Sequence, residues 1–147
     1  SVNPLCLMLC DRPAPPDAQL AQVSVQHWAA AALATGRAGV NEGSNAAVRH
    51  PDIQHLRSLV RTYPNDTIGR DGARVDVRLR DGTTITRAVA NALGSAANPM
   101  TDEQIDQKFL DQAQTVFDAH RAHDALAACR AVAAAPSLEA VFSICVR

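Results

Sequence analysis

The amino-acid sequence predicts an α+β fold: a small antiparallel sheet with helices on one face, followed by C-terminal helices. Residues 74–80 alternate strictly between charged and apolar side chains, which is the period of a half-buried strand. Residues 24–34 and 51–60 instead repeat their apolar side chains at helical spacing. Residues 101–147 carry wide apolar helix faces and no strand pattern. We therefore expect the last helices to form a separate layer that packs on a domain whose remainder is missing here.

The composition excludes several kinds of partner. The chain has 147 residues, of which 47% are hydrophobic and 20% charged, and this suffices for a domain with a core. Its 14 basic and 15 acidic side chains nearly cancel, whereas a nucleic-acid-binding domain carries a positive excess. No apolar run reaches the about 20 residues that span a membrane. We expect no nucleic acid and no membrane as partners.

The cysteines indicate a cytoplasmic protein without a metal centre. The chain has four of them, Cys6, Cys10, Cys129 and Cys145. A chain of this length folds without disulfide bonds, so we expect buried, reduced thiols. On a strand, Cys6 and Cys10 would lie about 13 Å apart at a rise of about 3.3 Å per residue, too far to share a metal ion. The sequence also lacks the common phosphate-binding and catalytic motifs, and we expect neither a metal nor a cofactor.

The N-terminal part is predicted to contain one strand and two helices. Residues 2–10 form an apolar run before a proline-rich stretch, which predicts a buried strand and a linker. The abrupt start of the chain indicates the middle of a longer protein. Ser24 is suited to cap a helix that runs to about Ala34 and ends at Gly36. We expect its buried face to consist of Val25, Trp28, Ala29, Ala32 and Leu33.

The middle of the chain predicts a second helix and a hairpin. Residues 46–49 form about one helical turn, and Pro51 is suited to begin the second helix. Its apolar face consists of Ile53, Leu56, Leu59 and Val60. Residues 62–72 are turn-rich. Asp81-Gly82 predicts a two-residue hairpin turn between residues 74–80 and a second strand at residues 84–90.

Three helices are predicted in the last third of the chain. Thr101 and Gln104 have the spacing of a capping box, in which each side chain satisfies a backbone N–H of the other. This helix is expected to continue through Phe117, and two more follow at residues 124–134 and 137–146.

The first turn of the helix capped by Ser24 is the candidate functional site. The N-terminus of a helix favours anions, so Ser24, Gln26 and His27 are suited to face a carboxylate. A single histidine in such a place is also commonly structural, and both interpretations remain open at this point. We expect His50 and His55 to be solvated, and His120 and His123 to lie at the end of the long helix.

Several stretches resemble the C-terminal region of the MmgE/PrpD family. This family includes 2-methylcitrate dehydratase, cis-aconitate decarboxylase and iminodisuccinate epimerase. The similar stretches, in chain order, are Asp11-Arg12-Pro13, residues 24–30, Arg49-His50-Pro51-Asp52, residues 75–82, Gly94-x-x-x-Asn98-Pro99-Met100-Thr101 and Lys108-Phe109. Where the family has Lys-Phe before the serine, this chain has Gln22-Val23.

The resemblance implies an architecture and an activity. Residues 1–91 would form an α+β lid domain, and residues 92–147 a helical segment that packs on a missing all-helical domain. The chain would be a fragment of a lyase of the 2-methylcitrate dehydratase type, acting on small polycarboxylates at an interdomain site. His27 would be catalytic, and Ser24 and Gln26 would bind substrate. The fragment alone would be inactive, because the other site residues belong to the helical domain.

The partner of the fragment would be the missing helical domain of the parent chain or a second copy in a homo-oligomer. The alternative is a non-catalytic binding or scaffold module, or a partner subunit that completes a site in trans.

Overall fold

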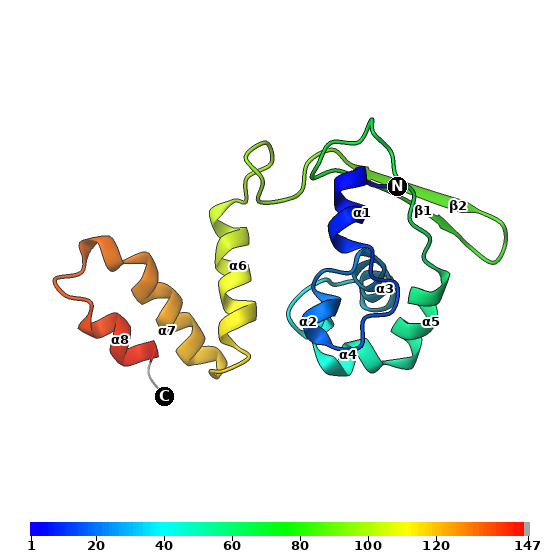
Figure 1. The fold of residues 1–147 in the computed structure, drawn as a ribbon. Coiled ribbons are helices and arrows are strands. Elements are labelled where there is room, and N and C mark those ends of the chain that lie inside the picture. The colour runs from blue at the N-terminus through cyan, green and yellow to red at the C-terminus, as the bar shows by residue number, and fades with distance from the viewer. Residues whose placement is uncertain (146–147) are drawn as a thin grey trace. The chain divides into compact units, whose positions relative to one another are not determined.

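The computed structural model describes residues 1–145, and the chain divides into two compact units after Pro99. The first is called the N-terminal unit below and the second the C-terminal unit. Helices and one small antiparallel sheet make up the described chain (Figure 1). The predicted α+β fold class is confirmed.

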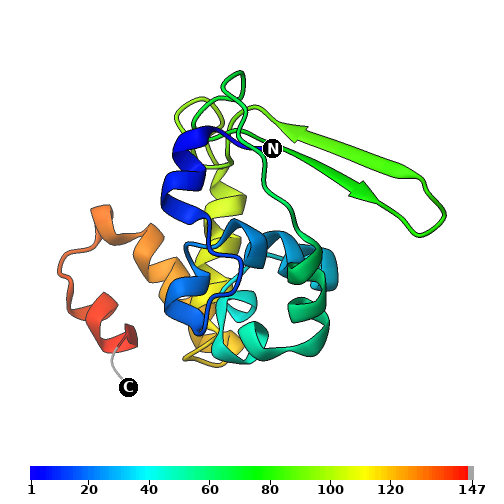
Figure 2. The same ribbon diagram turned by 45° about the vertical axis from the view of Figure 1, so that its right-hand side comes forward.

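The N-terminal unit combines short helices with one hairpin. The helices are α1 (Pro4–Cys10), α2 (Ala18–Ala21), α3 (Val25–Thr35), η1 (Asn41–Gly43), α4 (Asn45–Arg49) and α5 (Pro51–Leu59), and the strands are β1 (Ala73–Arg78) and β2 (Thr84–Val89). Its apolar core is small: Ala30 and Ala31 of α3 are buried with Ile53 of α5, and Ala47 and Leu56 pack against them. Figure 2 shows the hairpin projecting away from these helices.

The expected strand at residues 2–10 is wrong, because most of this segment is helix α1. Asn3 caps the helix by accepting a hydrogen bond from the backbone N–H of Leu5, and Pro4 occupies its first turn. Only Val2 pairs like a strand residue, through isolated bridges to Pro64 and Ala73. Strong local capping therefore overrides the apolar run.

The helical form of this segment also changes the geometry of its two cysteines. On a helix, residues four apart lie on one face, so the separation of about 13 Å expected for a strand does not apply. The pKa of the Cys6 thiol is raised, first by burial and then by the charge and hydrogen bonding of Cys10. Among the residues that the structure describes, no three His, Cys, Asp or Glu side chains gather in a way that could hold a metal ion.

Helix α3 has the predicted ends but a different buried face. Ser24 caps its start, and Gly36, with a φ of 73° in the left-handed region, ends it. The buried residues are Gln26, His27, Ala30 and Ala31, whereas Ala32 and Leu33 of the predicted face are exposed. The small alanines let α5 approach closely, and the two polar residues find hydrogen-bonding partners inside the unit.

The hairpin forms as predicted, with a different turn. Arg78 pairs with Thr84, and the backbone of Leu79 bonds to that of Thr83, so three residues form the loop. Gly82 has a φ of 88°, which is typical of a three-residue loop with glycine in the left-handed region. The predicted two-residue turn is therefore one residue too short. The sheet contains β1 and β2, and β2 is exposed along its length.

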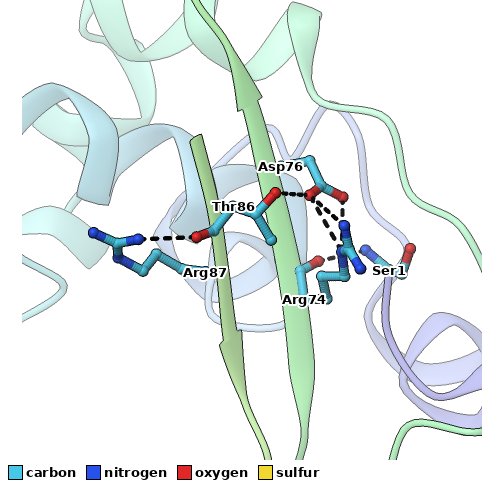
Figure 3. Close-up of polar contacts among 5 residues, drawn as sticks. All are labelled: Ser1, Arg74, Asp76, Thr86 and Arg87. Carbon is cyan, nitrogen blue, oxygen red and sulfur yellow. Dashed lines mark hydrogen bonds and ion pairs between the residues drawn. The ribbon is translucent and has the colours of Figure 1, made fainter. Parts of the chain in front are cut away.

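Asp76 links the two strands of the hairpin on its exposed face (Figure 3). It accepts a hydrogen bond of 2.5 Å from Thr86, its partner in the register, and forms an ion pair of 3.1 Å with Arg74. The N-terminal amine of Ser1 donates to the carbonyl of Arg74, which ties the start of the chain to β1. The hydrogen bonds from Arg74 and then Thr86 lower the pKa of Asp76.

The C-terminal unit consists of helices: α6 (Asp102–Ala113), α7 (Ala119–Arg130), η2 (Val132–Ala134) and α8 (Glu139–Cys145). The capping box of Thr101 and Gln104 is confirmed. Helix α7 begins earlier than predicted, because Asp118 caps it by accepting from the N–H of Arg121.

The early start of α7 corrects the position of two histidines. His120 and His123 lie near the N-terminus of this helix, not at the end of a long one. Residue 146, the expected last position of the final helix, lies outside the described residues. Across both units, none of the described helices has the length and apolar character needed to cross a membrane.

We expect the hairpin to lose stability in acid because of Asp76. A carboxyl whose pKa is lower in the folded state stabilises that state above its unfolded pKa, and this contribution disappears as pH falls through the folded pKa. Urea unfolding between about pH 6 and about pH 2, followed by circular dichroism, should show a smaller acid-induced loss in Asp76→Asn than in the wild type. Thr86→Val should reproduce part of this change, and Thr84→Val, in the same strand, should not. Identical pH profiles for wild type and Asp76→Asn would contradict the role of this carboxylate.

Candidate functional site

The first turn of α3 is held by a buried polar network. The Ser24 hydroxyl accepts a hydrogen bond of 3.0 Å from the N–H of His27 and donates one of 2.5 Å to the carbonyl of Arg12. The side-chain carbonyl of Gln26 accepts from the N–H of Arg12 at 3.2 Å, and its amide donates to the carboxylate of Asp11. Ser24 and Gln26 are both buried. Together they fix the segment before α2 onto the start of α3.

The imidazole of His27 is fully buried and contacts two other segments of the same unit. Its Nε2 lies 2.8 Å from the backbone carbonyl oxygen of Glu42 in η1. Its Nδ1 lies 3.5 Å from Nη1 of Arg57 in α5. The neighbouring Trp28 ring stands edge-on to it, with centroids 5.6 Å apart. The ring of His27 thus joins α3, η1 and α5.

The turn that carries Glu42 packs closely on Trp28. A Cβ added at Gly43 would lie 3.0 Å from the Trp28 ring, so a side chain there would require the ring or the turn to shift by a few tenths of an ångström. The Glu42 carboxylate accepts from the N–H of Gly39 at 2.8 Å and so stabilises the turn from within. These contacts hold the Glu42 carbonyl against His27.

Arg57 is a residue of this site that our sequence analysis missed. The residue is only 8% exposed, and Nη1 also lies 3.5 Å from the carbonyl oxygen of Val48. Burial lowers the pKa of the guanidinium. In the described part of the chain, the structure gives Arg57 no ion pair. The signal for it was present: a charged residue at position 57 interrupts the apolar face that begins at Ile53.

The three predicted site residues therefore lie together, but they bond to the protein itself. Each side-chain polar group of Ser24 and Gln26 has a partner within the N-terminal unit. A carboxylate that bound them would have to replace one of these hydrogen bonds. Substrate binding by Ser24 and Gln26 stays a prediction.

The other histidines belong to α4, α5 and α7 or to the residues that flank them. His50 and His55 are exposed, as predicted. His50 contributes to a surface cavity of about 390 Å³ lined by Ala34, Thr35, His50, Asp52, Ile53 and Leu56. In α7, His120 forms an ion pair of 3.1 Å with Asp124 when it is protonated.

Comparison with known protein families shows which family the chain is related to. A family model described as the MmgE/PrpD C-terminal domain matches residues 1–133. The chain belongs to the MmgE/PrpD family. The match includes the whole polar network around His27 and extends into the C-terminal unit. A search of curated proteins found no match. The resemblance of the dispersed motifs to the C-terminal region of the MmgE/PrpD family is thus confirmed.

We expect Ser24→Ala to destabilise the chain more than Ser44→Ala does. Ser44 caps α4 by accepting from the N–H of Ala47, whereas Ser24 caps α3 and also donates to Arg12. Loss of a cap costs about 1 kcal/mol, and loss of the second hydrogen bond adds about 0.5–1.5 kcal/mol. Urea unfolding of both variants measures the difference. Equal losses of stability would show that the bond to Arg12 contributes nothing.

Proposed function

We propose that this chain is the C-terminal part of an MmgE/PrpD enzyme of the 2-methylcitrate dehydratase type, a lyase acting on small polycarboxylates. The family match over residues 1–133 carries this proposal. In it, the N-terminal unit is a lid that contributes to an interdomain active site. The free thiols of Cys6, Cys10 and Cys129 support a cytoplasmic location, where thiols stay reduced.

His27 is the catalytic residue of the lid in this proposal, with Ser24 and Gln26 beside the substrate. The reaction removes a proton next to a carboxylate and expels water, so negative charge develops on the substrate. An imidazole with a buried guanidinium at 3.5 Å is a favourable environment for such charge. Because Nε2 is bonded to the Glu42 carbonyl, contact with substrate requires a substrate oxygen to replace that carbonyl.

The helical domain of the parent enzyme completes the site and covers the C-terminal unit. Among the described residues of this unit, only Ala122 and Ala125 are buried, which is a very small core for its helices. Large apolar side chains remain exposed on it: Ile105, Val116, Val132, Leu138 and Phe142. Exposed apolar surface of this kind marks an interface.

The decisive experiment is the His27→Ala variant of the enzyme assembled with its helical domain. With 2-methylcitrate, citrate, cis-aconitate and iminodisuccinate as candidate substrates, we expect kcat to fall by about 10²–10⁴-fold, as on loss of a group that acts in the transition state. The control is His55→Ala, because His55 is exposed on α5. Measuring kcat, KM and Tm together separates the possible roles. Unchanged kcat and KM with a lower Tm would end the proposal that His27 acts in catalysis.

The isolated chain should associate with itself through the C-terminal unit. Phe142 is 63% exposed on α8, so Phe142→Ser should weaken this association. Leu9, at 61% exposed on α1 of the N-terminal unit, offers a matched control, and Leu9→Ser should leave association unchanged. Light scattering over a range of concentrations measures both. A wild-type chain that stays monomeric at high concentration and binds no apolar dye would contradict this prediction.

A further inference from the structure

The partners of the His27 ring define which of its nitrogens carries the proton. The carbonyl oxygen of Glu42 can only accept a hydrogen bond, so Nε2 of His27, at 2.8 Å, must donate. The guanidinium of Arg57 can only donate, so Nδ1, at 3.5 Å, must accept through its lone pair. A ring that donates at Nε2 and accepts at Nδ1 is a neutral imidazole with its hydrogen on Nε2.

We propose that Arg57 is a positioning residue that holds His27 in this neutral state, so that His27 acts on a substrate oxygen as a hydrogen-bond donor. This inference rests on the proposed function and specifies the role of His27 within it. The lone pair of Nδ1 faces Arg57, so the ring has no free nitrogen with which to take up a proton. Its Nε2–H is the group offered to an acceptor.

The surroundings of the ring support the neutral state. A proton added at Nδ1 would place an N–H of the imidazolium against the N–H groups of Arg57, two donors without an acceptor. The nearest acidic residue in the turn, Glu42, directs its carboxylate to the N–H of Gly39 and presents only its backbone carbonyl to the ring. Charge at His27 is thus opposed by Arg57 of α5, and no described contact of the ring with a carboxylate compensates for it.

The acceptor that replaces the Glu42 carbonyl is a carboxylate or enolate oxygen of the substrate. Both bear negative charge and accept from a neutral N–H donor in a water-excluded site, where such a bond is strong. The positive charge of Arg57 beside Nδ1 polarises the ring, so that its Nε2–H becomes a stronger hydrogen-bond donor. His27 would therefore stabilise the charge that develops when another group, supplied by the helical domain, removes the proton.

The state of the ring can be measured in the isolated chain without any activity. In ¹⁵N NMR spectra at neutral pH, we expect His27 to show one protonated nitrogen, Nε2, and one unprotonated nitrogen, Nδ1, whose resonance is shifted by accepting a hydrogen bond. A wild-type ring that is doubly protonated, or protonated at Nδ1, would overturn the proposal.

Variants of Arg57 test whether this residue positions His27. Arg57→Met keeps an apolar stem and removes the donor, so the Nδ1 resonance should move to the value of an unbonded nitrogen. Arg61→Met is the control, because Arg61 is exposed and, among the described residues, bonds only to the carbonyls of Ser58 and Val60. A folded Arg57→Met chain with an unchanged Nδ1 resonance would refute the positioning role. If Arg57→Met does not fold, Arg57→Lys, which keeps a charged donor, is measured instead: a wild-type-like resonance supports the proposal and an unbonded one contradicts it.

Activity of the assembled enzyme then separates donation from proton transfer. The amide of glutamine can donate from near the position of Nε2 but cannot take up a proton at neutral pH. His27→Gln should therefore keep kcat within about tenfold of the wild type, whereas His27→Ala should lose about 10²-fold or more. Equal losses in the two variants would show that His27 transfers a proton. If the wild-type enzyme turns over none of the tested polycarboxylates, the proposed function fails, and the NMR spectra still decide the state of the ring.

Discussion

The imidazole of His27 is buried in the N-terminal unit, and each of its ring nitrogens requires a hydrogen-bond partner. This requirement helps to place the segments that surround the ring. A buried polar group without a hydrogen bond costs about 1–3 kcal/mol, so His27 requires both the Glu42 carbonyl and Arg57. The first requirement fixes the turn at residues 39–43 against α3, with Gly43 in contact with the Trp28 ring. The second requires α5 to direct a charged side chain inward. Two segments are thereby placed by a single ring.

In the N-terminal unit, hydrogen bonds between buried polar groups help to fix the positions of the helices. In most domains, the packing of large apolar side chains has this role. Only 3% of the residues are aromatic, and the apolar core consists largely of alanine with Ile53. Alanine contributes little buried area, so packing alone specifies the positions of the helices weakly. Hydrogen bonds are directional, and a fully satisfied buried network selects one arrangement. The contacts of Ser24 and Gln26 with residues 11–12 serve this purpose at the other side of α3.

Sequence patterns correctly predicted the helix and strand features that depend on residues close together in the chain. The caps at Ser24 and Thr101, the helix start at Pro51 and the alternation of the hairpin each depend on residues within a few positions. The predicted buried face of α3 was wrong because the buried residues depend on partners far away in the sequence, such as Arg57, 30 positions from His27, and Ile53. Likewise, the apolar character of residues 2–10 suggested a strand, whereas the cap at Asn3 and the proline in the first turn favour the helix that forms. The sequence indicated the first turn of α3 as a candidate site, but it could not indicate the partners of the side chains there, because these partners lie far away in the sequence.

The role proposed for His27 depends on hydrogen-bond partners that lie within this chain. Both partners of the ring, the Glu42 carbonyl and Arg57, belong to the N-terminal unit. In the proposed function, a helical domain would change the acceptor at Nε2, because a substrate oxygen brought to the site would compete with the Glu42 carbonyl. That competition favours an anionic oxygen, which accepts a stronger hydrogen bond than a neutral carbonyl does. In the proposed function, selectivity for carboxylates would follow from the neutral donor and the buried cation beside it.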